Sequence, residues 1–167
     1  LPISATLALG DALAVALMEL RGIKEEDFAQ NHPGGSLGRR LLTTVEDLMH
    51  SGDAIPKVFE DADSRLVIGE ISKKRLGVTL VIDHSDNLKG MVTDGDLRRL
   101  MEKEKDVTQL KASNMMAQNP KTITKETLAA KAVQIMEEHS ITSLIVSEEG
   151  KIQGIIHLHD ILKAGIV

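Results

Sequence analysis

One short sequence pattern occurs twice in this chain. Residues 90–96 read G-M-V-T-D-G-D and residues 154–160 read G-I-I-H-L-H-D, each at the end of an apolar run. The alignment keeps two residue types in step, Gly90 with Gly154 and Asp96 with Asp160. Two unrelated apolar runs would not preserve this register. The chain is therefore predicted to contain two copies of one unit, packed face to face because each is too small to stand alone.

Each copy has the same order of predicted elements. An opening segment is followed by a turn containing a proline, a short β-branched stretch, a helix, two strands joined by a polar hairpin, and a closing helix. The openings are 45–49 and 112–116; the later elements are 64–75, 78–82, 88–92 and 94–101 in the first copy, and 126–139, 142–146, 152–156 and 158–164 in the second. We expect a mixed α/β (α+β) fold of two β-α-β-β-α repeats, spanning 43–106 and 107–167.

Composition narrows the possible functions. Only 1% of the 167 residues are aromatic, so the stacking platforms that bind single-stranded nucleic acids are missing. The formal net charge of -5 disfavours binding to a phosphate backbone. The chain has no cysteine, which excludes disulfides and thiolate metal sites and fits a reducing cytoplasm. We expect a cytoplasmic protein with no nucleic-acid partner.

The first twenty residues are apolar but do not form an export signal. They lack a basic N-terminal region, and Asp11, Glu19 and Arg21 interrupt a stretch that is too short to cross a membrane. The pattern predicts a helix over residues 6–20 that is apolar on nearly all sides and must be buried. The rest of the chain offers little cover, so residues 1–42 are interpreted as the end of a preceding domain and a linker.

The T-x-x-D and H-x-x-D positions have two interpretations. Thr93 and Asp96 have the spacing of a capping box, in which each side chain bonds the backbone of the other residue. Histidine is a poor N-cap, however, and the second copy keeps Asp160 while His157 replaces the threonine. This change argues that the acid has a role beyond capping.

The alternative interpretation is a pair of ligand sites at the mouths of strand-to-helix turns. A carboxylate there accepts hydrogen bonds from two ribose hydroxyls, while a hydroxyl or imidazole and the helix N-terminal N–H groups hold a phosphate. Gly90 and Gly154, just before the strand ends, allow a ligand or a neighbouring backbone to approach closely.

His157 and His159 raise the question of a metal site. Alternation along a strand would place both imidazoles on one face. No cysteine and no third ligand recurs nearby in the sequence, so no metal is predicted. Polar contacts to a ligand and a structural role are the two remaining interpretations of these histidines.

The segment H-P-G-G-S-L-G-R-R at 32–40 is rich in glycine. It is not a Walker phosphate loop, because no Lys-Ser/Thr pair follows the glycines. Pro33 favours an extended conformation for His32 and places it at the edge of a loop. His32 is either part of a structural turn or an active-site imidazole.

Residues 44–167 resemble a tandem pair of CBS domains, also called a Bateman module. The resemblance rests on G-x-x-T-x-x-D and G-x-x-H-x-x-D, preceded by the D-L-M and N-M-M openings. CBS pairs bind nucleotides in clefts between their units and commonly form homo-oligomers. The resemblance implies that Thr93 and Asp96 contact the phosphate and ribose at one site and that Asp160 contacts ribose at the other. His157 departs from the usual Ser or Thr.

The whole chain resembles the arabinose-5-phosphate isomerases, in which a sugar isomerase (SIS) domain runs into a CBS pair. The motifs are A-T-L-A-L-G-D-A-L-A-V-A-L, H-P-G-G-S-L-G-R-R and the H-L-H-D ending. These enzymes interconvert ribulose 5-phosphate and arabinose 5-phosphate on the route to Kdo of lipopolysaccharide or capsule. The resemblance implies that His32 is an active-site residue. The other catalytic residues would lie upstream of Leu1, so we expect this chain to be inactive.

The resemblance also implies a regulatory role. No cofactor is expected to be required, but a nucleotide or a nucleotide sugar such as CMP-Kdo would be an allosteric effector. The expected partners are this ligand, the chain's own SIS domain and further copies of the chain. The alternative is a CBS module that assembles the oligomer with empty clefts.

Overall fold

The computed structural model describes residues 36–103 and 107–166, together with scattered positions between 6 and 22. His32 and much of the predicted helix over 6–20 lie outside the described residues, although the described positions from 6 to 20 are helical. Within the described part of the chain, no helix has the length and apolar character needed to cross a membrane.

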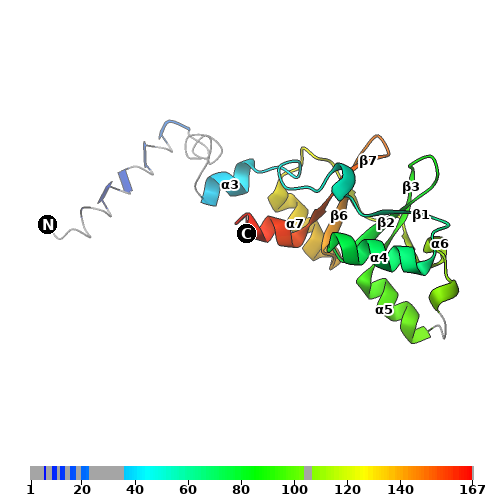
Figure 1. Ribbon diagram of the computed structural model, residues 1–167. Helices are drawn as coiled ribbons and strands as arrows, with labels where there is room; N and C mark the ends of the chain where they lie inside the picture. The colour runs from blue at the N-terminus through cyan, green and yellow to red at the C-terminus, as the bar shows by residue number, and fades with distance from the viewer. Residues whose placement is uncertain are drawn as a thin grey trace.

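The two predicted repeats are present (Figure 1). The first consists of β1 (Lys57–Phe59), α4 (Ser64–Lys74), β2 (Val78–Ile82), β3 (Leu88–Thr93) and α5 (Asp94–Lys103). The second consists of β5 (Thr122–Ile123), α7 (Ala129–His139), β6 (Ser143–Glu148), β7 (Lys151–His157) and α8 (Leu158–Lys163). Between residues 36 and 166 the structure also describes α3 (Ser36–Leu42), α6 (Ala112–Met115), β4 (Ala117–Gln118) and the short 3-10 helices η1 (Gly52–Ala54) and η2 (Val107–Gln109).

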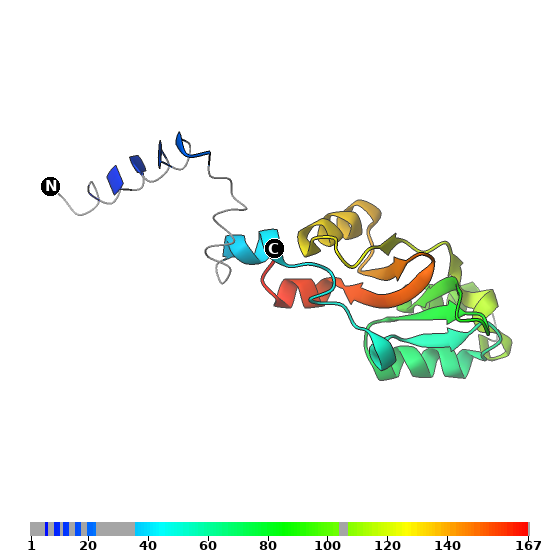
Figure 2. The ribbon, with the colours of Figure 1, turned by 90° about the horizontal axis from the view of Figure 1, so that it is seen from above.

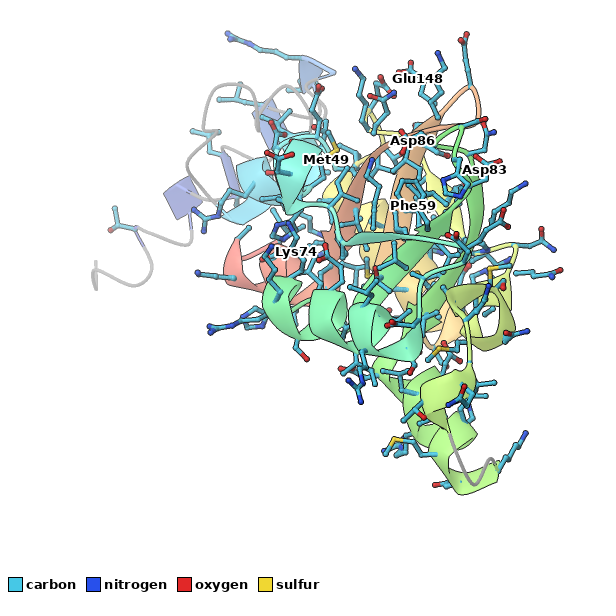
Figure 3. The ribbon with its side chains drawn as sticks, turned by 45° about the vertical axis from the view of Figure 1, so that its right-hand side comes forward. Met49, Phe59, Lys74, Asp83, Asp86 and Glu148 are labelled. Carbon is cyan, nitrogen blue, oxygen red and sulfur yellow. The ribbon has the colours of Figure 1, made fainter. Side chains whose placement is uncertain are left out.

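Both units have the same sheet topology. β1 is parallel to β2 and β5 is parallel to β6, so each of these connections crosses over through a helix, α4 or α7. β2 and β3, like β6 and β7, are antiparallel and joined by a hairpin. Asp83, Asp86 and Glu148 are labelled near the hairpin tips, which lie together at one end of the molecule (Figure 3). The strand-to-helix turns lie at the opposite ends of these strands.

The opening segments are exchanged between the units: the segment that begins each unit in the sequence packs on the other unit. The backbone N–H of Val45 donates to Thr127 of the second unit, and that of Ala112 donates to Ala62 of the first. β4 extends the first sheet through β3, and His50 forms the equivalent bridge to Ile155 of β7. The repeat predicts the openings but not that each one packs on the other unit.

Three clusters of buried apolar side chains lie within the residues that the structure describes. One lies in each unit, and each includes part of the exchanged opening: Val45 in the second unit and Met115 in the first. The third joins the sheets through buried side chains from both, including Leu80 and Ile145, each 0% exposed. The sheets therefore face each other across a shared apolar layer, with α4 and α7 on the outer sides (Figure 2).

Candidate functional site

A cleft of about 630 Å³ opens between the units at the strand-to-helix turns. The first unit contributes the segments 75–78 and 93–96, and the second contributes 140–143 and His157. A side pocket of about 200 Å³ lies between α5 and the segment formed by α6 and β4. Asp96, Arg99 and Ala117 line both spaces. The Asp96 carboxylate thus lies where the cleft meets the pocket.

Thr93 and Asp96 form the predicted capping box. The Thr93 backbone N–H and hydroxyl donate to Asp96 Oδ2 at 2.9 and 2.7 Å, and the Asp96 backbone N–H donates to Thr93 Oγ1 at 3.1 Å. These bonds satisfy backbone donors at the first turn of α5. The capping interpretation is therefore correct for the first unit, and it leaves Asp96 Oδ1 for other partners.

Arg99 contacts Asp96 Oδ1, with its Nη2 at 2.6 Å. Burial acts to raise the pKa of Asp96, but the hydrogen bonds from Thr93 and the Arg99 guanidinium outweigh it and hold the pKa below its usual value. The carboxylate is 19% exposed and ionised at neutral pH. Arg99 is 60% exposed, so its guanidinium can leave Asp96 for solvent or for an anion in the cleft.

The second unit does not repeat this geometry. His157 is the N-cap of α8, and its Nδ1 accepts the backbone N–H of His159 at 3.0 Å. The expectation that histidine would cap poorly here is wrong, because the imidazole nitrogen takes the acceptor role of a threonine hydroxyl. Burial lowers the pKa of His157; Asp160 opposes the shift, while His159 and His50 add to it. A neutral ring with its proton on Nε2 is the form that accepts this bond.

Asp160 pairs with a histidine that the sequence pattern does not reveal. His50 Nε2 lies 2.9 Å from Asp160 Oδ2, and the two side chains are 33% and 30% exposed. His50 follows the first opening segment, which packs on the second unit. Met49, its neighbour, is labelled in Figure 3. The sequence could not predict this pair, because His50 and Asp160 belong to different repeats and meet only because the first opening segment packs on the second unit.

The two histidines of the H-L-H-D ending lie on different elements. His157 is the last residue of β7 and His159 is the second residue of α8, so strand alternation does not place them on one face. No cluster of three or more potential metal-ligating side chains occurs within the described residues. His157 lines the central cleft, whereas His159 and Asp160 line neither of the two spaces described above.

Gly90 and Gly154 are close to neighbouring backbone. A Cβ at Gly90 would lie 2.6 Å from the Ala117 carbonyl oxygen, and one at Gly154 would lie 2.7 Å from the His50 carbonyl oxygen. Glycine was expected at these positions to let either a ligand or a neighbouring backbone approach closely. The structure shows the second, with the exchanged segments as the neighbouring backbone. Neither glycine lines the cleft or the side pocket. Their assignment to a nucleotide site stays a prediction.

Two facing β-α-β-β-α units with a cleft at their strand-to-helix turns define a class of protein. CBS domains match residues 45–103 and 112–166, and the chain belongs to the CBS domain family as a tandem pair. Over 164 residues it is 44% identical to arabinose 5-phosphate isomerase KdsD of Yersinia pestis, covering 98% of this chain and 50% of that relative. The chain thus spans about half the length of the curated relatives it matches.

Solved CBS proteins share the fold. The acetoin utilization protein AcuB from Vibrio cholerae superimposes with a TM-score of 0.66 at 18% identity, covering 75% of this chain and 92% of AcuB. CBSX2, solved in complex with AMP, superimposes with a TM-score of 0.62 at 22% identity, covering 74% of this chain and 96% of CBSX2. At these identities the likeness establishes the fold alone.

Proposed function

We propose that this chain is the nucleotide-sensing regulatory CBS pair of an arabinose-5-phosphate isomerase. Similarity to KdsD over 98% of the chain supports the assignment to this enzyme. In this proposal residues 1–42 are the end of the SIS domain and the linker, 43–106 the first CBS unit and 107–167 the second. His32 belongs to the isomerase active site, and the isolated chain is inactive. The parent enzyme works in the cytoplasm.

The position of Asp96 is the observation that carries the ligand assignment. Its carboxylate lies between a cleft large enough for a phosphorylated sugar and a side pocket with an apolar wall formed by Leu100, Met115 and Met116. Oδ2 is held by Thr93, while Oδ1 accepts from the exposed guanidinium of Arg99. A ribose diol that donates to Oδ1 would release Arg99 to pair with a phosphate or sugar carboxylate. The base would then occupy the side pocket.

A nucleotide or a nucleotide sugar satisfies these requirements. AMP is the ligand in the CBSX2 structure, and the fold is shared. CMP-Kdo, the activated end product of the pathway that arabinose 5-phosphate enters, fits a feedback role and carries an additional carboxylate for Arg75 or Arg99. Feedback requires the ligand to bind two arrangements of the isomerase oligomer with different affinities. The ligand, the SIS domain and further copies of the chain are therefore the proposed partners.

The alternative function is assembly with empty clefts. Its support is that Thr93 and Asp96 already satisfy each other as a capping box, so a ligand is not needed to explain the residue types. A comparison within the chain separates the two functions. Thr44 and Asp47 form a similar set of bonds, with Asp47 Oδ2 accepting from the Thr44 N–H at 2.8 Å and from its hydroxyl at 2.9 Å. Asp47 lines neither space.

Titration calorimetry with CMP, CMP-Kdo, AMP and ATP tests the proposal. We expect saturable heat with at least one of them. Asp96→Ala should abolish that heat, while Asp47→Ala, which loses a comparable set of turn-stabilising bonds, should leave it unchanged. Absence of heat with all four ligands would support the assembly module and overturn the sensor. Equal binding by wild type and Asp96→Ala would contradict the assignment of Asp96.

A further inference from the structure

At one pair of equivalent positions, the exchanged segments place a different residue beside each of the two acids, Asp96 and Asp160. Met91 pairs with Ala117 in the first sheet, and Ile155 pairs with His50 in the second. The glycine contacts agree with this correspondence, since Gly90 lies under the Ala117 carbonyl and Gly154 under the His50 carbonyl. Ala117 and His50 are therefore structurally equivalent.

The difference in size decides what lies beside each acid. Ala117 ends at its Cβ, and a side pocket of about 200 Å³ remains between it and Asp96. The imidazole at position 50 instead extends to Asp160 and bonds it at 2.9 Å. Solvent still reaches Asp160, which is 30% exposed. Asp160 Oδ2 nevertheless has a partner within the protein, and Asp160 lines neither the cleft nor the side pocket.

The strand-to-helix turns differ in the side chain that lines the cleft. Thr93 lines the cleft with a hydroxyl that already donates to Asp96, and the α5 N–H groups follow it. In the second unit His157 lines the cleft, and its Nδ1 is used by the His159 N–H. In both units these positions have internal partners, but the acid of the second unit is held by a histidine of an exchanged segment, whereas Asp96 Oδ1 is contacted by the exposed Arg99.

We infer that the pair binds one nucleotide per chain, on the Asp96 side, and that His50 closes the equivalent corner at Asp160. This inference rests on the proposed function and adds the number and place of the ligands. Binding at the second corner would require a sugar to displace the His50 imidazole from the carboxylate. Binding at the first requires only the exposed Arg99 guanidinium to move.

Stoichiometry and exchange of the two side chains test the inference. Equilibrium dialysis of the chain against whichever of CMP, CMP-Kdo, AMP and ATP gives heat should saturate at one equivalent. Ala117→His, which copies the second corner into the first, should lower affinity at least tenfold. Asp160→Asn should leave affinity within about twofold, because in wild type its carboxylate faces His50 rather than ligand. Retained binding in Ala117→His, or a tenfold loss in Asp160→Asn, would overturn the inference.

A measurement on the unaltered chain covers the case in which Ala117→His fails to fold. In amide NMR spectra the same nucleotide should shift residues 93–99 and 115–117 and leave 48–50 and 158–163 in place. Shifts centred on the second set, or saturation at two equivalents, would overturn the single-site inference while leaving nucleotide sensing intact. Absence of any binding would overturn the proposed function, and with it this inference.

Discussion

His50 Nε2 and Asp160 Oδ2 lie 2.9 Å apart although 110 residues separate them in the chain. The contact joins the first opening segment to the helix that closes the second unit. It exists because the openings are exchanged between the units, and it has no counterpart at Ala117. The His50–Asp160 contact is thus evidence both for the exchange of the opening segments and for the difference between the two units.

The His50–Asp160 contact should add little to overall stability. Both side chains are about one third exposed, and a solvent-exposed contact between two polar side chains contributes roughly 0.2–1 kcal/mol. A double-mutant cycle with His50→Ala and Asp160→Asn, read by urea unfolding, should give a coupling energy in this range. A coupling above about 3 kcal/mol would show a tightly buried interaction instead.

Alanine at Gly90 or Gly154 should destabilise the fold. The new methyl group would meet a carbonyl oxygen at 2.6 or 2.7 Å, so an exchanged segment must shift. Overpacking of this kind costs about 1–3 kcal/mol. Gly69→Ala is the matched control, because this position in α4 has nothing within 4 Å and alanine favours the helix by roughly 0.5–1 kcal/mol. Chemical denaturation should show a lower free energy of unfolding for Gly90→Ala and Gly154→Ala and a higher one for Gly69→Ala. Equal effects in all three would contradict the close approach of the exchanged segments to Gly90 and Gly154.

Asp96→Ala should lower stability by about 1 kcal/mol at neutral pH through loss of the α5 cap. The pKa of Asp96 is lowered in the folded state, so the unfolded chain takes up the proton first. The stabilisation from the Asp96 carboxylate is therefore present above the ordinary pKa of 3.8 and is lost as pH falls through the lower pKa of the folded state. Urea unfolding should show the wild-type and variant stabilities converging on acidification. A difference in stability between wild type and Asp96→Ala that grows as pH falls would contradict a capping role for the ionised Asp96 carboxylate.

His157 should make stability depend on pH in a different window. Its folded pKa lies below 6.5, so as pH falls beneath that value the unfolded chain binds the proton while the folded chain resists it. Stability should therefore fall between 6.5 and the folded pKa, and protonation of Nδ1 should remove the cap of α8. His157→Asn keeps a capping acceptor and should flatten this part of the profile. An unchanged slope in the variant would assign the dependence to another group.

Local sequence patterns predicted most elements but not their partners. The strands 78–82 and 88–92 and the helix 64–75 agree closely with β2, β3 and α4, because alternation, hairpin residues and helical spacing act within a few residues. The helix predicted from residue 126 begins at Ala129, since Thr124 and Thr127 form a turn before it. The exchange of the openings could not be read from the sequence, because two similar units offer similar local partners and tertiary packing selects between them.

Only part of the candidate site could be predicted, because local patterns show which residues lie at the ends of strands but not which residues of the other unit they contact. Thr93, Asp96 and His157 line the central cleft, as expected from their place at the ends of strands. Arg99 was not predicted, although its i,i+3 spacing from Asp96 on a helix was a usable signal. His50 had no such signal, because its partner lies in the other repeat.

A crystal structure of the chain saturated with CMP or CMP-Kdo distinguishes one occupied corner from two or none. We predict one nucleotide per chain, with its ribose hydroxyls on Asp96 Oδ1, its base in the side pocket beside Ala117, and the His50–Asp160 bond intact. A nucleotide whose ribose lies on Asp160 with His50 displaced, or clefts that stay empty at saturating ligand, would contradict it.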